Sequence, residues 1–253
     1  MNFEAKLIHN ISQIKRPKSI ISSGRVNRFD GNVIYCDPFP APIGSLCLVK
    51  DQIGKQVLAE VIRFDQNHNM LAILEPSSHI VAGCEVFLHD DGRYIDVDET
   101  LLGRVTDAFG KPLDEKPLGK INNKWPLMGK VMNPLKRSLI KKPLDVGVRV
   151  INALLTVGQG QRLGIIAGSG VGKSVLLGMM SKYTEADVVV IALIGERARE
   201  VGAMVNDLFN DEASKKITVV AVPADRSPLM RIRAANRATA IAEYFRDQNK
   251  NVL

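Results

Sequence analysis

Eight consecutive residues in the middle of the chain have the types and order of a phosphate-binding loop. They are Ala167, Gly168, Ser169, Gly170, Val171, Gly172, Lys173 and Ser174. An apolar run at 161–166 precedes them and a helix-like run at 175–180 follows. A loop between a buried strand and a helix directs backbone N–H groups at one small volume, where a polyphosphate can lie. The glycines let the backbone wrap the phosphates, Lys173 adds positive charge and Ser174 offers a hydroxyl to Mg²⁺. The sequence therefore predicts nucleotide binding; a glycine-rich turn without a ligand is the alternative.

Ala167 departs from the strict GxxxxGK[ST] pattern, because it stands where that pattern has its first glycine. Alanine is tolerated at this position if its φ angle is negative, since only a positive φ would favour glycine. The φ angle of Ala167 therefore decides whether alanine fits this loop.

A second group of charged residues follows the apolar run 187–194. These residues include Glu196 and Arg197. A carboxylate at the carboxyl end of a strand can orient and partly deprotonate a water that attacks a γ-phosphate, and an arginine can stabilise the developing charge. The spacing supports an alternative equally well, in which Glu196, Arg197, Arg199 and Glu200 are ordinary charges on the first turn of an exposed helix.

The elements that must position these groups alternate in βαβ order after Gly147. Strands are predicted at 162–167, 187–194 and 216–222, and residues 250–253 begin a further one. Helices are predicted from the phosphate loop to about Tyr183, near 199–209, and after Ser227, a cap residue ahead of the first-turn Pro228. This alternation predicts an α/β fold with a parallel sheet that binds ligands at the carboxyl ends of its strands.

The part of the chain before this core has a different pattern of short strands and turn signals. Strand-like runs occur at 32–36, 44–50, 56–64, 70–74 and 85–88. They predict a small closed barrel, which positions or assembles rather than catalyses. Residues 101–114 are predicted to form a hairpin, and 125–143 a connecting loop.

The first residues have the spacing of a short amphipathic helix. Its apolar positions are Phe3, Leu7, Ile11 and Ile14. Three roles remain open for it: packing on its own domain, docking to a partner helix, or resting on a membrane surface.

The composition narrows the class of protein. The 253 residues are 45% hydrophobic with a formal charge of +7, but aromatic residues make up only 5% and do not alternate with the basic ones, which argues against nucleic acid as a partner. Cys36, Cys47 and Cys84 lack zinc-site spacing and are predicted to be core thiols in a reducing compartment. No apolar run approaches the ~18 residues of a membrane span, and no signal peptide opens the chain, so a cytoplasmic protein is expected.

Several segments together carry a resemblance to a known family. They are 143–149, 151–158, 160–164, AGSGVGKSVLLGMM at 167–180, IGERAREV at 194–201 and ATAIAEYFRDQ at 238–248. They resemble the flagellar export ATPases, the type III secretion branch of the rotary ATPases, which is related to the catalytic β subunit of F-type ATP synthase. The similarity runs from about Gly24 to Leu253. Ala167 is expected in this branch, whereas Ala198 stands where many relatives have glycine.

The resemblance implies a RecA-like P-loop parallel sheet core, truncated, preceded by the small N-terminal β-barrel. The implied domains are an amphipathic helix at 1–20, the barrel at 21–95 and an ATPase core at 96–253 that is incomplete at its C-terminus. Residues 167–174 would bind ATP, with Mg²⁺ at Ser174. Glu196 would be the catalytic carboxylate, with Lys173 and Arg197 near the γ-phosphate; non-catalytic rotary subunits usually have glutamine in place of this glutamate.

The resemblance also implies partners and a location. The full-length protein would be a homohexamer that energises delivery of flagellar export substrates and their chaperones to a membrane gate. The N-terminal helix would dock a regulatory stalk-like protein, and the barrel would form the hexamerisation collar. Its place would be cytoplasmic and peripheral, at the inner face of the cytoplasmic membrane.

Parts that the family uses in catalysis lie beyond Leu253 in this comparison. They include the second magnesium-associated aspartate, the aromatic contact for adenine and the arginine that reaches a neighbour's site. The chain is therefore expected to be a piece of a longer protein that alone holds phosphate weakly and does not turn over ATP. Two alternatives stay open: an ion-translocating rotary ATP synthase subunit, and a non-catalytic assembly fragment.

Overall fold

The computed structural model describes residues 22–75, 79–168, 170–210 and 212–253. The chain divides into two compact units, Met1–Asp91 and Gly92–Leu253. The amphipathic helix predicted at 1–20 lies outside the described residues.

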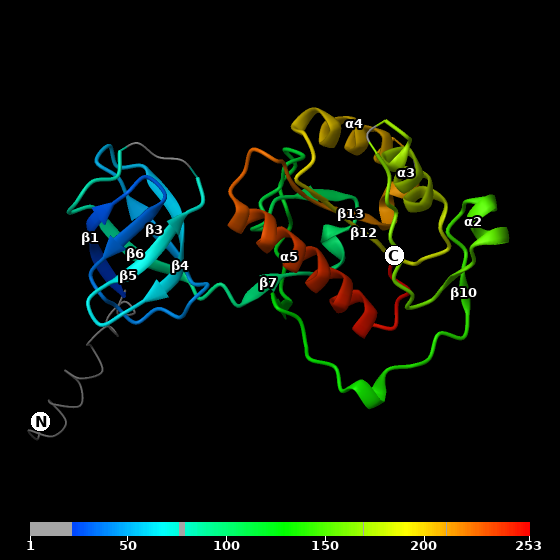
Figure 1. Ribbon diagram of the computed structural model, residues 1–253, viewed down its shortest axis with the longest axis horizontal. Helices are drawn as coiled ribbons and strands as arrows, with labels where there is room; N and C mark the ends of the chain where they lie inside the picture. Colours follow the sequence, from blue (N-terminus) through cyan, green and yellow to red (C-terminus); the bar gives the residue numbers. More distant parts are fainter. Residues whose placement is uncertain (1–21, 76–78, 169, 211) are drawn as a thin grey trace, which may run out of the picture. The chain divides into compact units, whose positions relative to one another are not determined.

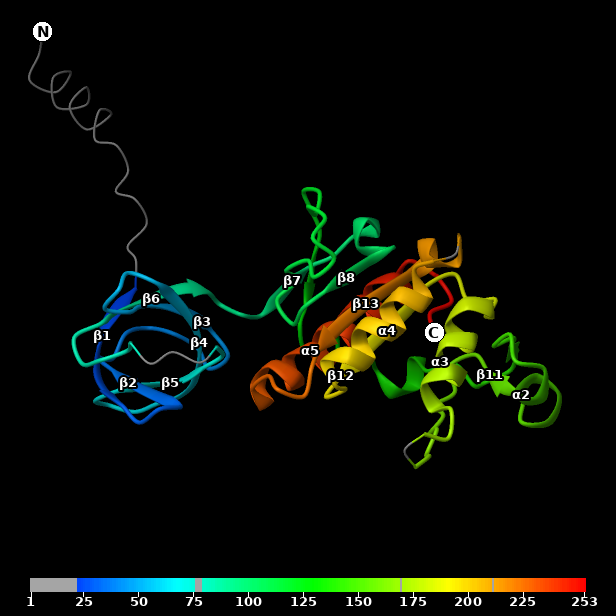
Figure 2. The ribbon, with the colours of Figure 1, turned by 90° about the horizontal axis from the view of Figure 1, so that it is seen from above.

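The described residues of the first unit form a closed barrel of six antiparallel strands in the order β1-β2-β5-β4-β3-β6 (Figure 2). The strands are β1 (Ser23–Phe29), β2 (Val33–Cys36), β3 (Leu46–Lys50), β4 (Gln56–Phe64), β5 (Asn69–Ile73) and β6 (Glu85–Asp90). The barrel closes because β1 pairs with β2 on one side and with β6 on the other. This confirms the predicted barrel, and β4 has the predicted bounds.

Among the six barrel strands, β1 is the one that the sequence pattern did not reveal. Its residues are SGRVNRF, and Val26 is its single buried side chain. A strand with so little apolar alternation gives no period-two signal, and its place is fixed by backbone pairing with two neighbours.

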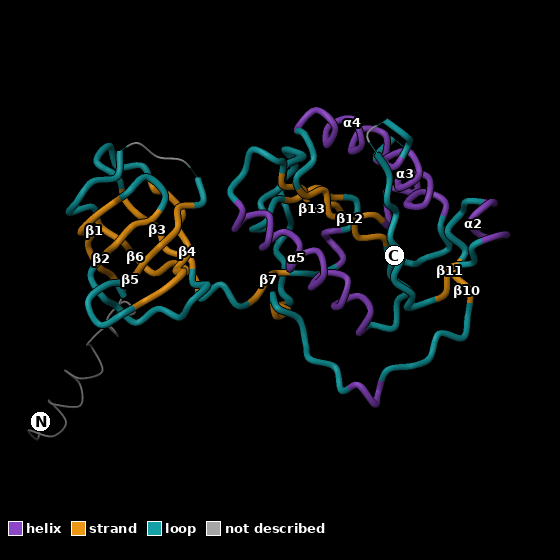
Figure 3. Tube along the Cα trace, in the orientation of Figure 1, coloured by secondary structure: helices purple, strands orange, loops and turns teal. Residues whose placement is uncertain are grey.

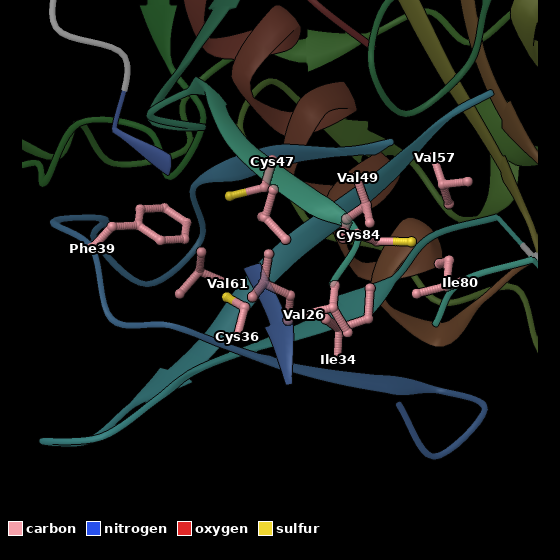
Figure 4. Close-up of a cluster of buried hydrophobic side chains, with 13 residues drawn as sticks. Val26, Ile34, Cys36, Phe39, Cys47, Val49, Val57, Val61, Ile80 and Cys84 are labelled. Atoms are coloured by element: carbon pink, nitrogen blue, oxygen red, sulfur yellow. The ribbon is translucent and has the colours of Figure 1, made fainter. Parts of the chain in front are cut away.

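The barrel interior is a single apolar cluster that includes all three cysteines, Cys36, Cys47 and Cys84 (Figure 4). Ile34 and Val61 are completely buried in the same cluster. Burial raises the pKa of the Cys36 and Cys47 thiols to about 12. These thiols are therefore core residues, as predicted, and not nucleophiles or metal ligands.

The second unit is built on a parallel sheet in the order β12-β13-β8. Its strands are β12 (Val189–Ile194), β13 (Ile217–Val222) and β8 (Arg104–Thr106). One face of β13, with Ile217, Val219 and Ala221, packs in an apolar cluster with helix α4 (Ala198–Leu208). Helix α5 (Pro228–Asp247) contacts β12 and β13 and lies on the side away from α4 (Figure 1). The sheet covered by helices confirms the predicted α/β core.

Smaller elements complete the second unit. They are β7 (Tyr94–Asp96), η1 (Glu99–Leu101), β9 (Lys124–Pro126), η2 (Pro134–Lys136), β10 (Pro143–Leu144), α2 (Arg149–Leu154), β11 (Val157–Gly158), α3 (Lys173–Tyr183) and η3 (Glu212–Lys216). Strand β7 pairs with β9 and β10 pairs with β11. The connection from β9 to β10 is a long loop interrupted by η2, as predicted (Figure 3).

Helix boundaries in the core follow the predicted signals. Helix α3 ends at Tyr183, and α5 begins at Pro228 with Ser227 as its cap. The Ser227 hydroxyl accepts a hydrogen bond of 3.3 Å from the Met230 N–H, which satisfies one of the free donors of the first turn.

The strand predicted at 162–167 is wrong for this structure. Residues 161–168 are irregular, and Ile166 is 99% exposed. A strand needs a neighbour for its backbone hydrogen bonds, and the edge of β12 away from β13 is occupied instead by 251–253. There the Val190 N–H donates to the Leu253 carbonyl at 2.9 Å, and Val188 bridges to Val252. The last residues thus add a single bridge where a further strand was predicted to begin.

The turn of the hairpin predicted at 101–114 is present, but the main pairing partner of its first strand is a different segment. Thr106 bridges to Pro112 across the turn, as in a hairpin. However, β8 belongs to the parallel sheet, where Thr106 pairs with Val220 of β13. No local pattern predicts this pairing, because its two strands are far apart along the chain.

Candidate nucleotide site

Two parallel strands bring the predicted site residues to one edge of the sheet. Strands β12 and β13 run in register to their last residues, where Ile194 pairs with Val222. The chain then turns at Gly195, whose φ of 75° suits glycine and whose N–H donates to the Val222 carbonyl at 2.9 Å. The Ala224 N–H returns a hydrogen bond of 3.0 Å to the Glu196 carbonyl. Glu196 is therefore held at the carboxyl end of the sheet by its backbone.

Lys173 and Glu196 meet at this edge. Lys173 is the first residue of α3, and its Nζ lies 3.4 Å from Glu196 Oε1. Both side chains are partly exposed, at 41% and 37%. An ion pair of this kind contributes only about 0–1 kcal/mol, so an incoming phosphate can replace the carboxylate as the partner of Lys173 at little cost. The structure thus joins the two chemical elements that lie on separate loops of the sequence.

The glycines of the phosphate loop leave open space for a ligand. Gly170 and Gly172 have φ angles of 78° and 94°, a region that favours glycine. A Cβ atom added at Gly168, Gly170 or Gly172 would meet nothing within 4 Å. The N-terminal N–H groups of α3 follow directly, and such groups bind anions. The loop therefore fits a polyphosphate.

Ala167 does not need the backbone freedom of glycine. The described non-glycine residues with positive φ are Glu115, Thr156 and Asn249. Ala167 is not one of them, so the departure from the strict loop pattern carries no backbone strain. Ser169 lies outside the described residues.

The remaining predicted site residues are placed but not brought into the Lys173–Glu196 pair. Ser174 is exposed in the first turn of α3 and is a hydroxyl ligand that fits Mg²⁺. Arg197 precedes α4 and pairs its Nη1 with Glu200 Oε1 at 3.4 Å. Among the described residues no cluster of three or more His, Cys, Asp or Glu side chains could hold a metal ion.

Sequence reasoning missed two polar residues at this edge, Asp225 and Arg226. They follow the carboxyl end of β13, next to the Ala224–Glu196 hydrogen bond. The signal was available, because polar residues directly after a fully buried strand lie at the same sheet edge as those after its neighbour.

The comparisons with known proteins identify a family and relatives of this chain. Residues 147–253 match the ATP synthase alpha/beta family, nucleotide-binding domain. The flagellum-specific ATP synthase of Pseudomonas aeruginosa is 44% identical over 256 residues, which cover 100% of this chain and 56% of that protein. The protein of the same name from Bacillus subtilis is 45% identical over 232 residues, covering 91% of this chain and 53% of that one. The chain thus spans about half the length of the curated relatives it matches.

Solved structures show the same fold. The assembled ATPase EscN from the type III secretion system of enteropathogenic E. coli matches with a TM-score of 0.80 and 40% identity. The match covers 90% of this chain and 55% of that one. The structure of EscN in complex with its central stalk EscO matches with a TM-score of 0.83 and the same identity, over 90% of this chain and 56% of that one.

Proposed function

We propose, since this chain belongs to the ATP synthase alpha/beta family, that the full-length protein is a Mg-ATPase that energises protein export through the bacterial flagellar type III apparatus. The observation that carries the proposal is the Lys173–Glu196 pair at the carboxyl edge of the β12–β13 sheet. It joins a phosphate-binding cation to a carboxylate in the position from which a water can be activated.

Each residue of the site has a role that follows from its position. Backbone N–H groups of the loop and of the first turn of α3 would hold the phosphates. Lys173 would leave Glu196 for the γ-phosphate, and the freed carboxylate would orient the attacking water. Ser174 would hold Mg²⁺, which supplies charge neutralisation on the phosphate oxygens when bound. Arg197 would take part in catalysis only by leaving Glu200 and pairing with the phosphate instead.

Glu196 argues against the non-catalytic alternative. A carboxylate can accept a proton from water. Glutamine, which non-catalytic rotary subunits usually have in place of this glutamate, cannot. The ion-translocating alternative is less favoured, because relatives that are 44% and 43% identical over 100% of this chain are named flagellum-specific.

Partners and location follow from the relatives. EscN has been solved assembled and bound to a central stalk. We therefore propose a homohexamer of the full-length protein with a stalk-like protein docked at residues 1–20, for which the sequence predicts an amphipathic helix. The domain division into 1–20, 21–95 and 96–253, with the barrel as the collar, belongs to this proposal. Export chaperones, substrates and a membrane gate would be its further partners.

The structure bears on the membrane in one respect. None of the helices in the described part of the chain is long and apolar enough to cross a membrane. The proposed location is peripheral, at the inner face of the cytoplasmic membrane.

Steady-state ATP hydrolysis by the full-length protein tests the proposal. Glu196→Gln is expected to lower kcat by about 10²–10⁴-fold, the usual contribution of a general base, and to leave nucleotide binding in place. Glu212→Gln is the matched control, because Glu212 is an exposed carboxylate on η3 paired with Lys215. Full activity of Glu196→Gln would remove Glu196 from the catalytic role, and no activity in the unmodified full-length protein would favour the assembly alternative.

A further inference from the structure

A buried arginine in the second unit lacks a partner for its charge. Arg237 lies on α5 and is 3% exposed. Within the described part of the chain its Nε has no hydrogen-bond partner, and its guanidinium forms no ion pair within 4.0 Å. Burial lowers the pKa of Arg237 to about 10, against the pull of the Asp107 and Asp96 carboxylates. The side chain still carries its charge at neutral pH, and an unpaired buried charge is costly.

The guanidinium borders a cavity of about 210 Å³. Other residues of its wall are Asp96, Phe109, Gly119 and Ile121. Asp96 and Gly119 are exposed, so the cavity is reached from solvent. Its volume is many times the ~15 Å³ that one water requires, so it has room for a small organic group.

A glycine turn makes room for the guanidinium. A Cβ atom added to Gly110 would lie 2.6 Å from Nη2 and 2.9 Å from Cζ of Arg237. Asp107 fixes this turn, because its Oδ1 accepts hydrogen bonds of 2.8 Å from both the Phe109 and the Lys111 N–H groups. The Asp107 carboxylate is thus engaged with backbone and forms no ion pair with Arg237.

The charges around the cavity favour a singly charged planar anion. A guanidinium presents parallel N–H donors that match the two oxygens of a carboxylate. Asp96 and Asp107 oppose a doubly charged phosphate, while Arg233, which shares α5, adds positive charge nearby. The apolar side chains of Phe109 and Ile121 suit a short hydrocarbon part beside the charged group.

We propose that this cavity is a binding site for a carboxylate group, with Arg237 as the residue that recognises it. The carboxylate belongs to a small organic acid or to an acidic side chain of a peptide. The site is separate from the phosphate loop and does not depend on the function proposed for that loop.

Titration of the 253-residue chain with sodium propionate tests the site, because propionate is a singly charged carboxylate with a short hydrocarbon part. The titration is followed by the ¹⁵N–¹H signal of Arg237 Nε and by the melting temperature. The signal is assigned by its absence in Arg237→Met. Propionate is expected to shift it in a saturable way and to raise the melting temperature above that in sodium chloride of equal ionic strength. An acetylated and amidated Gly-Gly-Glu-Gly-Gly peptide forms the second arm. Tighter binding of the peptide assigns the site to a protein side chain, and tighter binding of propionate assigns it to a free acid.

Matched variants separate recognition from folding. Arg237→Met keeps the length of the side chain and is expected to weaken propionate binding at least tenfold. Arg246→Met, which replaces an exposed arginine of the same helix, is expected to keep it. Gly110→Ala should also weaken binding, because its Cβ displaces the guanidinium. Gly54→Ala is its control, since Gly54 has a similar φ of 82° and nothing within 4 Å.

Two results would overturn the site. One is an Arg237 Nε signal that does not respond to saturating propionate or peptide, and the other is undiminished binding in folded Arg237→Met. Lys173→Ala is expected to remove nucleotide binding and keep propionate binding, so failure at the phosphate loop and failure at this cavity are distinguishable.

Discussion

In the barrel every strand has a hydrogen-bonded neighbour on both sides, whereas the segment that leads into the phosphate loop has no strand neighbour among the described residues. Both regions contain apolar residues of the same types. In the barrel they face a closed interior, and Ile34 is completely buried. Before the phosphate loop Ile165 is only partly buried, and Ile166 is 99% exposed. The difference shows that an apolar run specifies a strand only where a backbone partner is present.

The largest effect is expected when an isoleucine is replaced in each of the two regions. Ile34→Ala is expected to destabilise the barrel by about 2–5 kcal/mol, because it leaves a cavity in a closed core. Ile166→Ala should change stability by less than about 0.5 kcal/mol, because an exposed side chain loses no packing. Chemical denaturation followed by far-UV circular dichroism measures both. Equal costs for the two variants would mean that residues 161–168 are packed in solution.

Alanine substitutions at two glycines with positive φ distinguish the cost of steric overlap from the cost of backbone strain. A Cβ atom at Gly147 would lie 2.2 Å from Tyr183 Cβ, so Gly147→Ala is expected to cost about 3 kcal/mol through overlap and strain. Gly170→Ala should cost about 1–2 kcal/mol through strain alone, because the space around it is open. Fluorescence of Trp125, the single tryptophan, reports unfolding of this unit. A larger cost at Gly170 than at Gly147 would contradict the open loop.

The second unit should lose stability in acid through one ion pair. Arg104 Nε and Nη2 donate to both oxygens of Asp114 at 2.7 and 2.8 Å, and the Arg104 guanidinium lowers the pKa of Asp114 from 3.8 to about 2. A lowered carboxyl pKa stabilises above the unfolded value, and the stabilisation is lost as pH falls from about 4 to about 2. The loss is about 2 kcal/mol, since one pKa unit corresponds to about 1.4 kcal/mol.

Trp125 fluorescence in urea at a series of pH values follows this transition. Asp114→Asn should be less stable at neutral pH and lack that part of the acid dependence. Asp187→Asn offers a comparison, because Asp187 accepts a backbone hydrogen bond from Asn251 and has no arginine partner within 4.0 Å among the described residues. An unchanged acid profile in Asp114→Asn would rule out the pair as its source.

The smallest effect is expected for the barrel cysteines, whose thiols should not react in the native protein. Cys36 and Cys47 should resist a thiol-specific reagent at pH 8 in the native protein, because their pKa values of about 12 leave them protonated and the barrel interior excludes the reagent. All three cysteines should react at once in denaturant. Absorbance of the released thiolate measures the rate. Prompt native reaction at two or more thiols would show that the barrel opens readily.

Much of the architecture was predictable from residue pattern. The βαβ order, the end of α3 at Tyr183 and the cap at Ser227 follow from local signals that tertiary structure did not override. The loop and Glu196 were predicted as separate elements, and the β12–β13 register supplied the reason why Lys173 reaches the carboxylate.

What failed depended on partners distant in sequence. Strand β1 has one buried side chain, so only its two neighbours define it. The run 162–167 has the composition of a strand but no ladder to join, and the place beside β12 belongs to 251–253. The buried Arg237 was assigned no role, because a helical pattern does not reveal which polar position meets a cavity.

The pairing of Thr106 with Val220 has a consequence for the order of folding. Barrel strands pair within the first ninety residues or so, and such a unit can fold while the ribosome is still synthesising the rest. Strand β8 cannot pair until β13 has been synthesised. A contact between segments so far apart in the sequence also costs more chain entropy to close. During synthesis the second unit therefore stays unfinished, with the β13-facing backbone hydrogen-bonding groups of β8 unpaired, until Val220 has emerged.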